Sequence, residues 1–364
     1  FKQKTAYEIR LSLVGSEMCI RDRDKEDCKD LHVCVSNGTR YYDLLAYKLS
    51  KNQLSVRDGN ADTIQGFITG ECNAMVDSKG GIRAVRNGLL ASPGVDASHV
   101  ENDIIVGASF GLEPMALCVR EDDVQWRDFV FWVFEAIHAG ERYGITQNSS
   151  SSTTTTPSWA APWAASSSKG GLSYATTNVF GEGTKYMLQD AVAAAGNFDE
   201  IDNLLDPLAF PLKDTVGFND GTEGIMLSLA LGKTEEEGPG PHPDGTLATI
   251  LQRGQLRCAV RLNRPGFAER HSDNSTIGFA WSGMDVDYCR AVHGAIFATM
   301  SEEEVELVEV VDDEEGFKML HDGDVDVYAG VMMTMERDVL EPSTKMGFAF
   351  SRPYFYNVSA LLAK

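Results

Sequence analysis

The feature that most constrains this chain is an alternation of short strand-like segments with helical segments, which starts twice along the sequence. In the first series, strand-like residues 31–35 and 74–76 lie on either side of a helix-like segment at 41–49. The second series follows residue 245, with strands at 256–260, 305–310 and 325–329 and helices at 285–297 and 314–321. Strands that alternate with helices are typical of an α/β fold with a largely parallel sheet. The sequence therefore predicts two α/β units.

Residues 126–138 (WRDFVFWVFEAIH) predict an amphipathic helix. Its apolar face comprises Trp126, Phe129, Val130, Val133, Phe134 and Ile137. An aromatic stripe at helical spacing is more often core than a platform for a ligand, so we assign these side chains to the core. Another helix is expected at residues 180–195.

Two stretches interrupt the pattern. Residues 148–171 are rich in Ser, Thr and Ala, a composition that buries too little apolar surface to order itself, and they predict an inserted flexible loop. Residues 233–244 are acidic and rich in Pro and Gly, which is typical of a linker. We therefore expect residues 24–232 and 245–364 to form separate compact lobes joined by an exposed linker.

Composition excludes several classes of protein. The 364 residues carry 54 acidic and 32 basic side chains, a formal net charge of -22 that would repel nucleic acid and anionic membrane surfaces. No apolar run approaches the roughly 20 residues that a membrane span needs. The seven cysteines form no Cys/His cluster with zinc spacing, so neither a metal site nor a cofactor is predicted.

Residues 1–23 resemble a translated sequencing adapter rather than a signal peptide, because no basic region leads into their short apolar patch. On this interpretation the native N-terminus is missing. An ordinary amphipathic segment is the alternative.

Three segments of the second series share a resemblance to a known family. They are residues 281–292 (WSGMDVDYCRAV), 256–267 (LRCAVRLNRPGF) and 329–356, which contains a Thr-x-x-x-Arg-like segment. These segments closely resemble the first lobe of general L-amino-acid-binding periplasmic proteins. Those proteins belong to solute-binding protein family 3 and have the type II periplasmic-binding fold, in which Rossmann-like α/β lobes contain mixed sheets.

The first series resembles the second lobe and the C-terminal region of the same family, at residues 33–39 (VCVSNGT), 113–146 and 180–232. The order is thus second lobe, then first lobe. Two explanations remain open. We favour a fragment of a tandem array, cut so that it holds the second lobe of one copy and the first lobe of the next. A circular permutant is the alternative.

The resemblance implies a set of ligand-binding residues. Arg337 would hold the α-carboxylate bidentately with support from Thr334, unless it is a surface arginine paired with Glu336 or Asp338. From the second lobe, Gly38 and Thr39 would donate to the carboxylate, or they form an ordinary turn and helix cap.

Asp77 is the predicted partner of the ammonium group, although an ungapped alignment places Ser78 at the family's Asp. Phe267 would cover the ligand, with an apolar core role as its alternative. Met332 stands where the family has a hydroxyl residue, and a thioether cannot donate to a carboxylate. Asp285, as a helix cap, and Asp287 are assigned to structure.

The family's fold also implies two disulfides, Cys34 with Cys72 and Cys258 with Cys289, which would leave Cys19, Cys28 and Cys118 over. Such bonds indicate an oxidising compartment.

The function that the resemblance implies is non-enzymatic capture of a polar L-amino acid outside the cytoplasm, in the periplasm or after secretion, for the membrane subunits of an ABC transporter. The alternatives are a sensor domain like that of ionotropic glutamate receptors, an enzyme like cyclohexadienyl dehydratase, and a degenerate lobe kept for interactions. None of the seven histidines lies in a motif that marks a catalytic dyad.

Overall fold

The structure is a computed structural model of the whole chain. It describes residues 30–37, 39–91, 105–106, 110–150, 172–202, 239–262, 264, 266–271, 281–298 and 305–363. The adapter-like residues 1–23, most of the predicted insert and the first half of the linker lie outside the described residues. The chain divides into two compact units: unit 1 is Phe1–Glu113 with Tyr356–Lys364, and unit 2 is Pro114–Phe355.

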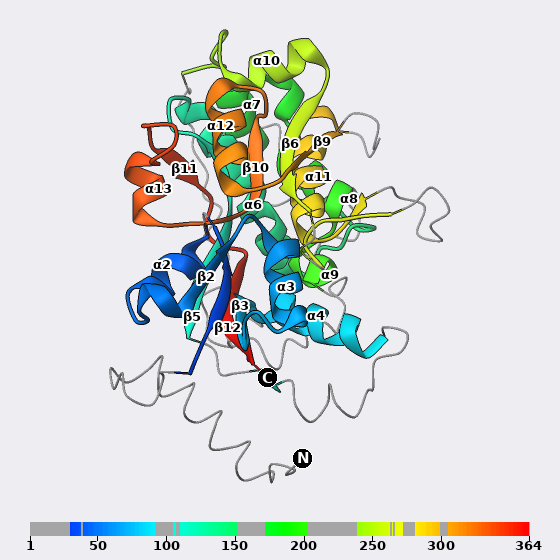
Figure 1. The fold of residues 1–364 in the computed structure, drawn as a ribbon. Helices are drawn as coiled ribbons and strands as arrows, with labels where there is room; N and C mark the ends of the chain where they lie inside the picture. Colours follow the sequence, from blue (N-terminus) through cyan, green and yellow to red (C-terminus); the bar gives the residue numbers. More distant parts are fainter. Residues whose placement is uncertain are drawn as a thin grey trace. The chain divides into compact units, whose positions relative to one another are not determined.

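Unit 1 is built on a mixed sheet with strand order β2-β1-β3-β12. Its strands are β1 (Val33–Ser36), β2 (Leu54–Arg57), β3 (Ala74–Ser78), β4 (Ile105–Val106) and β12 (Phe355–Ala363). Its helices are α2 (Arg40–Ala46), the 3-10 turn η1 (Lys51–Gln53), α3 (Asn60–Thr69) and α4 (Lys79–Ala91). Strands β1, β2 and β3 are parallel, and β12, red in Figure 1, runs antiparallel to β3.

Alternating side chains separate the two faces of this sheet, because successive residues of a strand point to opposite faces. Val33, Val35 and Val76 contribute to one apolar core with Leu45 of α2. Cys34 and Met75 contribute to the other, with helix residues that include Phe67 of α3. Cys34 forms a disulfide with Cys72, which confirms that predicted bond.

Unit 2 contains strands that pair in the order β5-β10-β6-β9, with β11 also paired to β5. Its strands are β5 (Gly111–Arg120), β6 (Leu256–Arg261), β9 (Val305–Val310), β10 (Val327–Met332) and β11 (Phe348–Phe350), besides the small pair β7 (Glu269–Arg270) and β8 (Trp281–Ser282). Strands β6, β9 and β10 are parallel, whereas β5 is antiparallel to β10. The predicted α/β fold with mixed sheets is confirmed, and it is consistent with the type II periplasmic-binding fold.

The helices of unit 2 are α6 (Val124–Tyr143), α7 (Leu172–Phe180), η3 (Glu182–Thr184), α8 (Met187–Ala195), α9 (Phe198–Asp202), α10 (Thr246–Arg253), α11 (Met284–Phe297), α12 (Asp313–Asp322) and α13 (Met335–Leu340). The Asp123 side chain accepts the Trp126 N–H and so caps α6. The whole predicted apolar stripe of α6 is buried, as expected. The predicted helix at 180–195 was wrong in extent, since the chain breaks at Gly181 and η3 before α8 begins.

The compact units do not follow the predicted division at the linker. Strand β10, which follows the linker, pairs with β5, which precedes it, through Val331 opposite Ala116 and Met332 opposite Met115. Likewise Tyr288 of α11 stacks on Phe134 of α6, with ring centroids 5.7 Å apart. A change of composition marks an exposed connection, but it does not decide which segments share a core. The assignment of the segments to two copies stays a prediction.

Three cysteines lie in unit 2. Cys258 and Cys289 form the second predicted disulfide, and Cys118 is a free, buried thiol.

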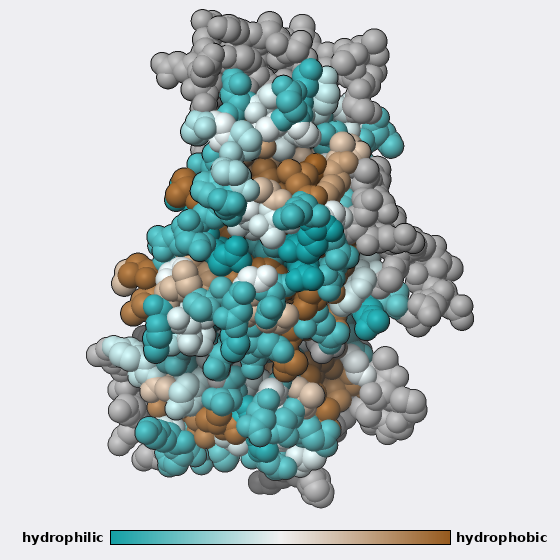
Figure 2. All heavy atoms as spheres, turned by 90° about the horizontal axis from the view of Figure 1, so that it is seen from above, coloured by the Kyte–Doolittle hydropathy of each residue, from teal (hydrophilic) through white to brown (hydrophobic). Residues whose placement is uncertain are grey.

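The face drawn in Figure 2 is mostly hydrophilic, with apolar side chains in separate patches. Within the described part of the chain, no helix is both long and apolar enough to cross a membrane.

Candidate ligand-binding site

Arg337 lies in unit 2, in the first turn of α13. Thr334 is the N-cap residue of this helix, and its hydroxyl oxygen accepts the Arg337 N–H at 3.2 Å. The guanidinium donates to Asp313 at 2.7 Å and to the Met332 carbonyl at 3.1 Å, and it lies 5.0 Å over the Phe317 ring. The acidic partner of Arg337 is therefore Asp313, from a different helix, rather than a neighbour in sequence.

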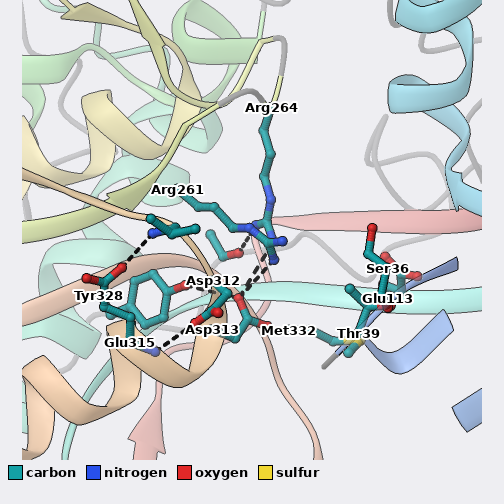
Figure 3. Close-up of polar contacts among 12 residues, drawn as sticks. Ser36, Thr39, Glu113, Arg261, Arg264, Asp312, Asp313, Glu315, Tyr328 and Met332 are labelled. Atoms are coloured by element: carbon teal, nitrogen blue, oxygen red, sulfur yellow. Dashed lines mark hydrogen bonds and ion pairs between the residues drawn. The ribbon is translucent and has the colours of Figure 1, made fainter. Parts of the chain in front are cut away.

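Asp313 brings two more arginines into the same place. Its carboxylate accepts hydrogen bonds from Arg261 at 3.2 Å and from the Tyr328 hydroxyl at 3.0 Å, and an Arg264 nitrogen lies 3.9 Å away (Figure 3). We call Arg261, Arg264 and Arg337 the arginine cluster. Burial acts to raise the pKa of Asp313, but the guanidiniums of Arg337, Arg261 and Arg264 outweigh it and hold that pKa well below its usual range.

The backbone explains why these side chains meet. Arg261 ends β6, and Tyr328 lies on β10, its parallel neighbour. Asp312 caps α12 by accepting the Glu315 N–H at 2.9 Å, which places Asp313 at the first helical position. In open α/β sheets, ligands bind at the carboxyl ends of the parallel strands. The cluster lies at that edge of the unit 2 sheet.

Met332, the predicted departure from the family, and Phe267, a predicted ligand contact, are both buried in unit 2. The Met332 side chain is 9% exposed, and the residue serves Arg337 through its carbonyl. Phe267 is 4% exposed and packs edge-on against Phe355, with ring centroids 5.0 Å apart. This packing matches the core alternative for Phe267. Its contact with a ligand stays a prediction.

The prediction that Asp285 caps α11 was wrong, because the N-cap residue is Gly283. Asp285 lies inside the first turn and is fully buried, and its Oδ1 accepts the Tyr354 hydroxyl at 2.5 Å. Asp287, which is 5% exposed, pairs with Arg290 at 2.7 Å. Burial is the largest influence on both carboxyls and raises the pKa of each to about 6.

In unit 1, Thr39 precedes α2 and is half-buried. Its hydroxyl donates to the Ser36 carbonyl at 2.7 Å, while the Ser36 hydroxyl bonds to that of Thr63 at 2.8 Å. The helix cap is thus a backbone conformation only, without a side-chain bond to the helix. Gly38 lies outside the described residues.

Asp77 and Ser78 end β3, next to the end of β1 at the same edge of the sheet. The Asp77 carboxylate accepts the Ser78 N–H at 2.6 Å, and the Ser78 hydroxyl accepts the Gly81 N–H at 3.0 Å. Ser78 therefore supports the start of α4, which gives a structural reason for a hydroxyl residue here. Asp77 is half-buried, and its carboxylate also lies against the start of α4, where a Cβ at Gly81 would be 2.8 Å from Asp77 Oδ2.

Glu113 is an anionic group of unit 1 that the sequence interpretation did not identify. It is 5% exposed, and its carboxylate accepts Ser359 at 2.6 Å, Asn357 at 3.3 Å and Tyr41 at 3.4 Å. Figure 3 shows Glu113 as well as Ser36 and Thr39. No motif pointed to it, because it lies in a mostly apolar strand.

Each unit, taken by itself, carries polar groups of a different kind. Unit 2 contains guanidiniums, which suit a carboxylate, and unit 1 contains hydroxyl groups and carboxylates, which suit an ammonium group. Among the described residues, no group of three or more His, Cys, Asp and Glu side chains could hold a metal ion.

Two curated proteins illustrate what the chain is similar to. It is 30% identical over 119 residues to the glutamate/glutamine/aspartate/asparagine-binding protein BztA of Rhodobacter capsulatus. These residues cover 32% of this chain and 33% of BztA. It is 27% identical over 141 residues to the general L-amino acid-binding periplasmic protein AapJ of Rhizobium johnstonii. These residues cover 38% of this chain and 38% of AapJ. The chain matches between a third and two fifths of the length of these relatives.

By their names, these relatives are amino-acid-binding proteins rather than enzymes, and AapJ is periplasmic. The predicted resemblance to solute-binding protein family 3 is confirmed by these matches. No protein-family model and no solved structure matches the chain.

Proposed function

We propose that this protein binds a polar L-amino acid and that Arg337 holds the α-carboxylate. The observation that carries the proposal is the arginine cluster around Asp313. Three guanidiniums face one carboxylate there, so their summed positive charge is larger than the single negative charge of Asp313 that they share. A ligand carboxylate would supply a further anion in the geometry that arginine binds best.

Recognition of the ammonium group belongs to unit 1 in this proposal. Asp77 is the predicted partner, and Glu113 is a second carboxylate within the same unit. Thr39 would add a hydroxyl group. Gly38 and Phe267 are further predicted contacts.

The cellular role follows from the family resemblance. We propose that the protein works outside the cytoplasm and delivers its amino acid to the membrane subunits of an ABC transporter. Disulfides Cys34–Cys72 and Cys258–Cys289 support an oxidising compartment. A tandem array remains our proposal for the origin of the segment order.

Calorimetric titration against the twenty common L-amino acids tests this function. The native protein should bind at least one polar amino acid. Arg337→Ala should weaken that binding by about 1.5 to 3 kcal/mol, roughly tenfold to hundredfold, because a charge-assisted pair is lost.

Arg257→Ala is the matched control. Arg257 lies on β6 and pairs with Glu306 at 3.1 Å, outside the arginine cluster, so its removal should leave the affinity unchanged. Undiminished binding by Arg337→Ala would show that the carboxylate site is elsewhere. Failure of the native protein to bind any of the twenty would contradict the proposed function itself.

A further inference from the structure

A buried carboxylate lies behind the arginine cluster. Asp285 is fully buried in the first turn of α11, and its Oδ1 accepts the Tyr354 hydroxyl at 2.5 Å. Its Oδ2 is buried as well and makes no hydrogen bond with the described part of the chain. Such a group is costly to bury, so its surroundings should respond to its charge.

Tyr354 joins Asp285 to an irregular point of β10. The Tyr354 hydroxyl accepts the Gly330 N–H at 2.6 Å. At this point the register between β10 and β5 shifts, between Tyr328 and Val331, and Gly330 has a φ of 71°. A Cβ at Gly330 would overlap Asp285 Oδ2. The carboxylate thus packs directly against the backbone of the irregularity.

The other side of Gly330 contacts the arginine cluster. Its carbonyl accepts a hydrogen bond from the Arg264 guanidinium, whose other terminal nitrogen lies 3.9 Å from Asp313. A series of polar contacts therefore runs from Asp285 through Tyr354 and the backbone N–H and C=O groups of Gly330 to Arg264. Every member of the series belongs to unit 2.

We propose that Asp285 is a positioning residue, which acts through Tyr354 and Gly330 to set Arg264 and thereby makes the carboxylate affinity of the arginine cluster depend on pH. The part about affinity rests on the proposed function. The coupling between Asp285 and Gly330 does not, because it concerns the protein without a ligand.

The direction of the effect follows from the charges. Burial raises the pKa of Asp285 to about 6, while the Tyr354 hydrogen bond and the Arg264 charge act to lower it. Among the described residues, the titratable and charged groups that act on this carboxyl are Tyr354 and Arg264. Tyr288 stacks on Tyr354, with ring centroids 4.4 Å apart. Protonation of Asp285 removes a negative charge behind Arg264, so a carboxylate should bind more tightly below about pH 6. By linkage, a bound carboxylate should raise the pKa of Asp285.

Asp287 offers a matched control on the same helix. It is also buried, and its pKa is also raised to about 6, but its partner is Arg290 instead of Tyr354. Asp285→Asn removes the carboxylate that begins this series of contacts, whereas Asp287→Asn removes a buried carboxylate outside it. Comparison of the two variants therefore separates the effect of the series from the general effect of removing a buried acid.

The first experiment uses no ligand. In a glycine-labelled NMR sample, the Gly330 amide resonance should shift with pH, with a midpoint near 6. The shift should vanish in Asp285→Asn, become smaller in Tyr354→Phe, which removes the hydroxyl link but keeps the carboxylate against Gly330, and persist in Asp287→Asn. A Gly330 resonance that does not titrate, or that titrates unchanged in Asp285→Asn, would overturn the proposed coupling.

The second experiment measures affinity for L-glutamine, whose side chain does not titrate between about pH 5.5 and 7.5. The native protein and Asp287→Asn should bind it several-fold more tightly at the lower pH, up to about tenfold for a pKa rise of about one unit. Asp285→Asn should lose this dependence. Dependence retained in Asp285→Asn would contradict the effect on affinity. If glutamine binds at neither pH, the polar amino acid that the calorimetric titration identifies replaces it, and the Gly330 titration decides the coupling in the protein without a ligand.

Discussion

At the scale of single residues, Asp313 holds the arginine cluster together. Arg261 and Arg337 donate to it, and its side chain is only 15% exposed. We expect Asp313→Asn to lower the free energy of unfolding by about 3 kcal/mol at pH 7, because the guanidiniums lose the charge that offsets their repulsion. Urea denaturation measures this change.

The pH dependence of this loss has a definite sign. The pKa of Asp313 in the folded protein lies below its ordinary value, so the carboxylate stabilises the fold above the unfolded pKa of about 3.9, and this contribution fades as the pH falls below it. The difference between native protein and Asp313→Asn should therefore shrink in acid. Asp322→Asn, which removes an exposed partner of Lys318, should leave the denaturation midpoint nearly unchanged. Equal stability of Asp313→Asn and native protein at pH 7 would contradict the argument.

Sequence reasoning located some of these residues and missed others for physical reasons. Arg337 and Thr334 lie three residues apart in a family-like motif, so local sequence sufficed to single them out. Asp313 and Glu113 gain their roles from strands and helices that pair over long sequence distances, which no local pattern reveals. Asp285 was placed as a helix cap because Asp favours that position, but Gly283 adopts it and Asp285 is buried instead.

At the scale of secondary-structure elements, helical spacing predicted α6 well because its apolar stripe is long and regular. The pattern at 180–195 was weaker, and a turn interrupts it. The sequence could not predict that α8 packs on α11, because a glycine such as Gly294 does not show which other segment lies against it. In the structure, a Cβ at Gly294 would overlap the Ala194 side chain and lie 2.8 Å from the Asp190 carbonyl oxygen.

Gly294→Ala tests this close approach. The added methyl group should force α8 and α11 apart and destabilise the protein by about 1 to 3 kcal/mol, the usual effect of overpacking. Gly88→Ala in α4 makes the same change at a helical glycine whose Cβ would meet open space, so it should stabilise by up to about 1 kcal/mol. Thermal unfolding of both variants measures the difference. Similar shifts for the two would show that helix propensity, rather than packing, dominates at Gly294.

At the scale of the whole molecule, each unit is assembled from segments that lie on both sides of the linker in the sequence. Unit 2 combines strand β5 and helices α6 and α8, from before the linker, with β10 and α11 from after it. In unit 1, β12 from the end of the chain pairs with β3, through contacts such as Leu361 opposite Val76. The change of composition and the strand-helix pattern that restarts after it suggested a cut at the linker, but noncovalent pairing joins the two sides of that cut in both units.

A protease site inserted between Glu235 and Glu236 distinguishes these descriptions. Disulfide Cys34–Cys72 lies wholly before the insertion and Cys258–Cys289 wholly after it, so neither bond holds the two pieces together. After cleavage, the pieces should still elute as one species of native size in gel filtration, and they should separate only in denaturant. Their association depends on the burial of large side chains such as Phe134 and Tyr288, whose exposure would be costly. Two independently folded pieces that separate without denaturant would instead restore the division at the linker, with each lobe complete in its own segment.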